Sequence, residues 1–96
     1  MDTNTKLEQI RNRGIELLWA SGHIRADQAI GEFSYLVEQW RKRIQAESKP
    51  DDVLSEVLQD ETSDFAKHIF GENNYAYFGS EICMLIEKLF GVGFRS

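Results

Sequence analysis

The sequence predicts an all-α fold, a small antiparallel four-helix bundle, or one with three long helices and one broken helix. One proline and seven glycines among 96 residues supply too few turns for a protein made of many short strands. The hydrophobic content of 42% and the aromatic content of 11% are typical of a folded chain. Apolar residues also recur at steps of three and four. We therefore expect one helical domain over residues 1–96, with 91–96 as a loose tail apart from Phe94.

The first helix is expected to begin at Thr5, where Thr-Lys-Leu-Glu fits a capping box completed by Glu8, and to stop at Gly22. Its apolar stripe contains Gly14, which costs about 1 kcal/mol relative to alanine inside a helix. We interpret Gly14 as a point where another helix approaches closely. The second helix, expected over about 25–47, has the clearest pattern, with apolar residues at alternating steps of four and three. These residues are Ala26, Ile30, Phe33, Val37, Trp40 and Ile44.

Ser48 and Pro50 are expected to open a third helical segment over about 50–70, with Ser48 as its cap. Glu61 falls on the apolar side of this segment, where burying a carboxylate is expensive. A break near 61–63 would resolve the conflict, and a continuous helix with Glu61 at the edge of the core is the alternative. The fourth helix is expected over 75–90, ending at Gly91. Its apolar stripe is Tyr75, Phe78, Ile82, Leu85, Ile86 and Leu89.

Charge is unevenly distributed along the chain, which has a net charge of −5. Residues 1–50 hold eight Lys/Arg and seven Asp/Glu, whereas residues 51–96 hold three and nine. Asp52, Glu56, Asp60 and Asp64 recur every four residues, with no Lys or Arg between Pro50 and Ala66. This acidic row is either a solvated face or a surface complementary to a basic partner.

Two further apolar pairs lie off the main stripes. Tyr77 and Met84 are seven residues apart in the fourth helix, and Ile15 and Trp19 are four apart in the first. Tyr, Trp and Met are typical of contact centres, so we interpret both pairs as surfaces for a partner or for a homodimer. Tyr75 and Phe78, by contrast, lie three residues apart on the main apolar stripe of the fourth helix, so we expect them in the core.

The sequence contains no recognised catalytic, cofactor or metal motif, and we expect no cofactor, no metal and no enzyme activity. Cys83 is the only cysteine and lies among apolar neighbours, which indicates a buried, inert thiol. Three pairs at i,i+4 carry metal-ligating side chains without a complete motif. They are His23 and Asp27, Asp64 and His68, and His68 and Glu72. The chain has no stretch long and apolar enough for a membrane span, so we expect a cytoplasmic protein.

These observations favour a non-enzymatic protein-binding module, a regulator or inhibitor of a partner with a basic surface. The expected contact residues are Asp52, Glu56, Asp60, Asp64, Tyr77, Met84, Ile15 and Trp19. The alternative is a helix-turn-helix-like nucleic-acid-binding protein that uses the cluster Arg41, Lys42 and Arg43. The net negative charge makes direct nucleic-acid binding the weaker hypothesis.

Overall fold

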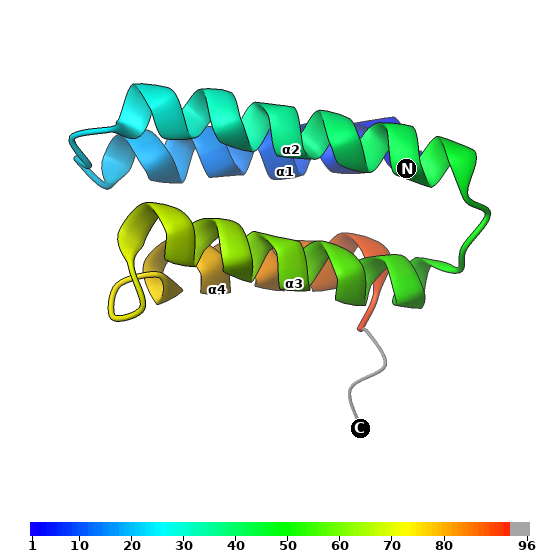
Figure 1. Cartoon of the computed structure of the whole chain (residues 1–96). Coiled ribbons are helices and arrows are strands. Elements are labelled where there is room, and N and C mark those ends of the chain that lie inside the picture. Colours follow the sequence, from blue (N-terminus) through cyan, green and yellow to red (C-terminus); the bar gives the residue numbers. More distant parts are fainter. Residues whose placement is uncertain (93–96) are drawn as a thin grey trace. The chain divides into compact units, whose positions relative to one another are not determined.

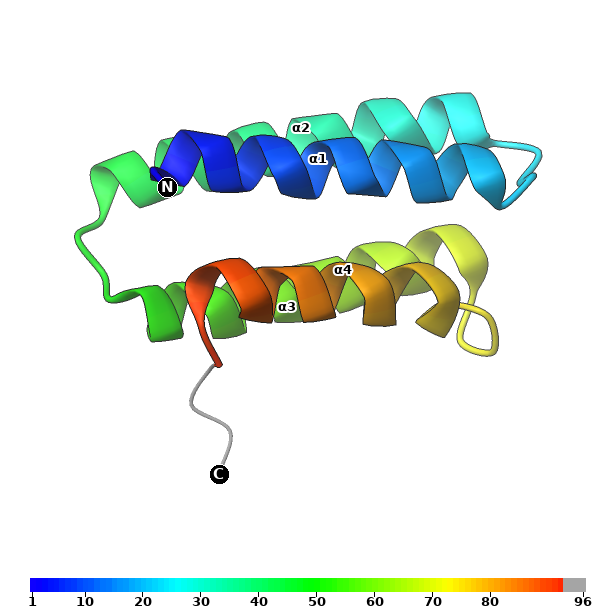
Figure 2. The ribbon, with the colours of Figure 1, turned by 180° about the vertical axis from the view of Figure 1, so that it is seen from behind.

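A computed structural model describes residues 1–92 of the chain. Within them it has four α-helices and no strand: α1 (Thr3–Ala20), α2 (Ala26–Ala46), α3 (Asp51–Phe70) and α4 (Ala76–Phe90). The predicted all-α fold class is confirmed. The helices pair as two antiparallel hairpins, α1 with α2 and α3 with α4, and both views show the two helices of each hairpin side by side (Figures 1 and 2). The chain divides into two compact units, Met1–Ala46 and Glu47–Ser96, and the single domain stays a prediction.

The first hairpin is organised around a close approach of α2 to α1 at Gly14. A Cβ atom added at Gly14 would lie 2.2 Å from Cε2 of Phe33, far inside van der Waals contact. Phe33 is fully buried and stands edge-on to the buried Trp40, with ring centroids 6.2 Å apart. The interpretation of Gly14 as a site of close helix approach is therefore confirmed. Ile30 and Ile44 of the predicted seam are only half-buried, whereas Ala29 is buried beside it.

The start of α1 differs from the prediction. The helix begins at Thr3, and Asp2 is its cap, with Oδ1 accepting a 2.8 Å hydrogen bond from the backbone N–H of Thr5. The capping box at Thr5 is therefore wrong, because the aspartate three residues earlier already satisfies that donor. At the other end, the helix stops at Ala20, and Gly22 has the positive φ of 68° expected for a left-handed stop.

The third helix is continuous, so the predicted break near 61–63 is wrong and the alternative is confirmed. Glu61 is half-buried at the edge of the packed side, which lets its carboxylate reach water. Thr62 does not recap a new helix. It is fully buried, and its Oγ1 donates a 2.8 Å hydrogen bond to the carbonyl oxygen of Leu58 in the preceding turn. The helix follows Pro50 directly, and the proline rather than Ser48 is its N-terminal flanking residue.

A polar seam joins α3 to α4. Ser55 and Gln59 are both buried, and Gln59 Nε2 donates a 3.0 Å hydrogen bond to Ser55 Oγ. Ser55 Oγ in turn donates a 2.5 Å hydrogen bond to the carbonyl oxygen of Gly91, immediately after α4. That carbonyl is one of the groups that a helix end leaves without an intrahelical partner. The seam therefore ties the end of α4 to the first turns of α3.

The fourth helix ends at Gly91 as predicted, with φ of 100° at that glycine. Phe78, Ile82 and Ile86 are buried, as the stripe requires. Leu85 and Leu89 are only half-buried, while Phe90 is buried in their place. Of the predicted loose tail, residues 93–96, including Phe94, lie outside the described residues.

Candidate partner-binding surfaces

The acidic row on α3 runs from the edge of the buried side toward solvent. Asp60 and Asp64 are exposed, whereas Asp52 and Glu56 are half-exposed. The buried residues of the helix are Leu54, Ser55, Leu58, Gln59, Thr62, Ala66 and Ile69. Because α3 is unbroken, the four carboxylates form one row on a single rigid element. At about 1.5 Å per residue, successive members are about 6 Å apart along the axis.

Tyr77 and Met84 lie on the outward side of α4. Their exposed fractions are 47% and 65%, which are high for large apolar side chains. Glu81, also exposed, falls one turn after Tyr77 and just before Met84. Residues at i, i+4 and i+7 share a helix face, so the three side chains form one outward row of mixed character.

A chain of aromatic rings runs from the core of the second hairpin to Tyr77. Phe65 lies against the buried Phe78 with centroids 5.6 Å apart, and Phe78 lies 6.1 Å from Phe70. Phe70 is half-buried and stands nearly perpendicular to the ring of Tyr77, with centroids 6.5 Å apart. The exposed tyrosine is thus supported from beneath by rings that are themselves packed.

Tyr75 is not the core residue that the sequence predicts. It is half-buried at the position just before α4, although its backbone is helical and its carbonyl oxygen accepts a 2.8 Å hydrogen bond from the N–H of Gly79. The ammonium of Lys67 lies 5.1 Å from the centroid of its ring, within the range of a cation–π interaction. The ring lies beside both this cation and the buried Gly79, whose added Cβ would be 3.4 Å from Tyr75 Cδ2. The sequence gives no direct signal for the cation, because Lys67 lies on the other helix.

In the first hairpin, the other predicted pair is only partly exposed. Trp19 is 58% exposed near the end of α1, whereas Ile15, one turn earlier, is half-buried. Ile24, in the turn between α1 and α2, is 96% exposed. Ile24 was not among the predicted contact residues, since an isolated apolar residue in a turn has no periodic signal.

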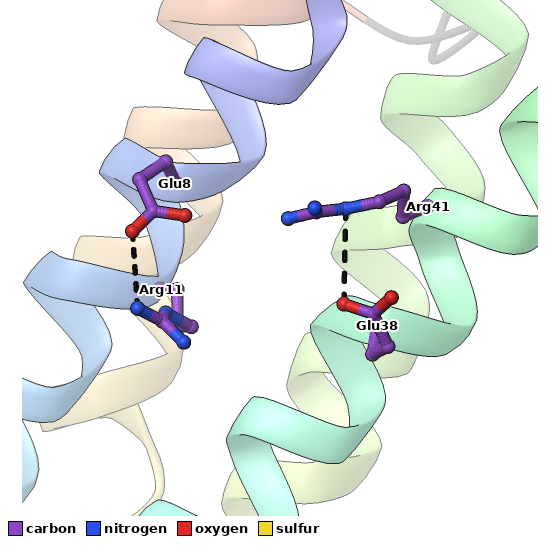
Figure 3. Close-up of polar contacts among 4 residues, drawn as sticks. All are labelled: Glu8, Arg11, Glu38 and Arg41. Atoms are coloured by element: carbon purple, nitrogen blue, oxygen red, sulfur yellow. Dashed lines mark hydrogen bonds and ion pairs between the residues drawn. The ribbon is translucent and has the colours of Figure 1, made fainter.

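The basic cluster of the alternative hypothesis does not form one free surface. Arg41 Nε lies 3.7 Å from Glu38 Oε2, and the side chain points from α2 toward α1, where Glu8 and Arg11 are paired at 3.0 Å (Figure 3). Lys42 is exposed and Arg43 is half-buried. An open depression beside Arg41 is lined by both charge signs, with Asp2, Asn4, Thr5 and Glu8 on its other sides. Carboxylates on this side oppose phosphate binding.

Cys83 is half-buried, so the thiol is less buried than the sequence predicts. Its Sγ donates a 3.6 Å hydrogen bond to the carbonyl oxygen of Gln59 and lies 3.9 Å from Ser63 Oγ. Within residues 1–92, no group of three or more His, Cys, Asp or Glu side chains is arranged to hold a metal ion. None of the helices in that part of the chain has the length and apolar character needed to cross a bilayer.

No family model matches this chain, and neither a curated protein nor a solved structure shows significant similarity to it.

Proposed function

We propose that this chain is a non-enzymatic protein-binding module that regulates or inhibits a partner with a basic surface. The observation that carries the proposal is the uninterrupted acidic row of Asp52, Glu56, Asp60 and Asp64 along the continuous helix α3, with its last two members exposed. Small acidic inhibitors of nucleic-acid-handling enzymes, such as immunity proteins, antitoxins and phage-encoded blockers, fit this physical description.

The energetics of the row favour a partner over simple solvation. Like charges at i,i+4 destabilise a helix by about 0.2–0.5 kcal/mol per pair, so three successive pairs cost on the order of 1 kcal/mol. Alternating acidic and basic residues would keep the face soluble without that cost. A single-signed row instead accelerates association with an oppositely charged surface and discriminates against other partners.

Affinity is proposed to come from Tyr77 and Met84, which are outward-facing side chains of the types found at interface centres. Self-association belongs to the same proposal and is assigned to Ile15 and Trp19. The first hairpin holds seven Lys/Arg and six Asp/Glu, whereas residues 47–96 hold four and ten. A second copy therefore meets less like-charge repulsion at the first hairpin than at the second.

The test is affinity capture from extracts of the native organism, with mass spectrometry of the retained proteins. Wild type is compared with the charge-reversal variant Glu56→Lys, Asp60→Lys and Asp64→Lys. A control variant with the same change in charge carries Glu8→Lys, Glu16→Lys and Asp27→Lys in the first hairpin.

The proposal expects one basic protein to be retained in stoichiometric amount by the wild type and by the control, and to be lost with the α3 variant. Its association rate should fall as salt increases. Retention of the same protein by the α3 variant, or of no protein by the wild type, contradicts the proposal. Salt-sensitive binding to DNA that requires Arg41, Lys42 and Arg43 would establish the nucleic-acid alternative instead.

A further inference from the structure

Tyr77 is an exposed ring that contacts packed aromatic neighbours. It stands nearly perpendicular to Phe70, which in turn contacts the fully buried Phe78. A side chain that is already held in place loses little conformational entropy when a partner binds it. An exposed ring kept in position by packed neighbours is thus better suited to contact than a freely rotating one.

The neighbours of Tyr77 on α4 combine a negative charge with an apolar surface. The carboxylate of Glu81 comes one turn later, and the apolar side chain of Met84, a residue 65% exposed, comes two turns later on the same side. An arginine side chain has matching parts, because its methylene stem is apolar and its guanidinium is cationic. An arginine bound here would set its stem against Met84 and its guanidinium toward the ring of Tyr77 and the carboxylate of Glu81.

The second hairpin already engages a cation in this way. The ammonium of Lys67 on α3 lies 5.1 Å from the ring centroid of Tyr75, two residues before Tyr77. The charge of the hairpin also selects the occupant, since residues 47–96 carry a net charge of −6, from four Lys/Arg and ten Asp/Glu. A second copy of this hairpin would bring like charge to the surface, whereas a cationic segment would be attracted.

We propose that Tyr77, Glu81 and Met84 form the docking surface for an arginine side chain in a basic segment of a protein partner. This inference rests on the proposed function and specifies what the partner presents. Arginine is favoured over lysine because its planar guanidinium stacks on aromatic faces and is less strongly hydrated than an ammonium. Tyr77 supplies the anchor, and the acidic row on α3 attracts the rest of the segment.

The probe is a blocked nine-residue peptide rich in arginine, with lysine and citrulline counterparts, titrated into the full chain and followed by NMR. Binding should shift the resonances of Tyr77, Glu81 and Met84 and weaken from arginine to lysine to citrulline. Tyr77→Leu should lower the affinity about two- to fivefold, the range expected for an exposed cation–π contact. Tyr77→Phe should retain the affinity, because the ring face remains.

Tyr35→Leu is the matched control, since Tyr35 is 67% exposed on α2 of the other hairpin, and it should leave the affinity unchanged. The anchor is overturned if Tyr77→Leu binds as wild type does, if Tyr35→Leu weakens binding equally, or if citrulline binds as well as arginine. If Tyr77→Leu has no effect but the Glu56, Asp60 and Asp64 reversal abolishes binding, the anchor fails while the acidic row is retained. If neither change affects binding, both proposals fail.

Discussion

Replacing Gly14 with alanine tests the close approach of α1 and α2. In an exposed helix this substitution stabilises the protein, because glycine costs about 1 kcal/mol relative to alanine. Here the new methyl carbon would lie 2.2 Å from Phe33 Cε2 and 2.7 Å from Cδ2, so the ring has to move. Phe33 is fully buried and packed edge-on against Trp40, so moving the ring disturbs this packing.

The net effect follows from two opposing terms. Overpacking a well-filled core costs about 1–3 kcal/mol, and a contact this short belongs at the upper end of that range. After subtracting about 1 kcal/mol of improved helix propensity, Gly14→Ala should lower the free energy of unfolding by about 2 kcal/mol. For a chain of this size, the loss corresponds to a decrease in Tm of roughly 8–16 °C.

Gly31 provides the matched control, because it is an exposed helical glycine whose added Cβ would have nothing within 4 Å. Gly31→Ala should raise the free energy of unfolding by about 0.4–1 kcal/mol. Circular-dichroism melts and urea titrations of the two variants should therefore move in opposite directions. If Gly14→Ala stabilises the protein as Gly31→Ala does, the close approach is absent. Phe33→Leu combined with Gly14→Ala should recover part of the loss, because it removes the clashing ring edge.

Three other predictions use Asp2, Trp19 and the tyrosine pair. The hydrogen bond from the Thr5 backbone N–H holds the pKa of Asp2 below its ordinary value. The ionised carboxylate therefore stabilises the folded state above the unfolded-state pKa of about 3.9, and this stabilisation is lost as pH falls through the folded pKa. Asp2→Asn should keep the cap but flatten this part of the acid dependence of Tm, and an unchanged acid dependence would contradict it. Trp19→Ser should convert a dimer, measured by light scattering, to an 11.1 kDa monomer, whereas a monomeric wild type would refute self-association. Tyr75→Ala should lower Tm more than Tyr77→Ala. The loss of unfolding free energy in Tyr77→Ala should stay within about 0.5 kcal/mol, because Tyr77 is exposed. Equal losses of Tm in parallel melts would contradict the different burial of the two residues.

The sequence predicts the helices well where one physical signal dominates. The steps of four and three in α2 locate Phe33, Val37 and Trp40 in the core because a helix repeats every 3.6 residues. Gly14 is predictable for a related reason, since a costly residue inside a helix needs a packing explanation. The cap at Asp2 is harder to predict from the sequence, because several neighbouring polar residues are suitable caps and only the structure identifies the one used.

The sequence predicts that Tyr77 and Met84 are exposed, but it does not predict the contacts that surround them. Helical spacing puts Tyr77 and Met84 outside the main stripe, and both are exposed. Spacing within one helix does not report what another helix contributes, however. The support of Tyr77 by Phe70 and the cation beside Tyr75 both cross from α3 to α4. These features therefore depend on the pairing of the two helices.

The continuity of α3 also depends on how the helix packs. Apolar residues alone suggest that Glu61 interrupts the packed side, which makes a break attractive. The polar and small residues indicate the opposite. Ser55, Gln59, Thr62 and Ala66 recur at steps of four, three and four next to the apolar side. They widen the buried arc, and their polar groups need hydrogen-bond partners, which Leu58 and Gly91 supply through their carbonyl oxygens. A helical period among small and polar residues, beside an apolar row, therefore indicates a second packed face and favours one unbroken helix over two short ones.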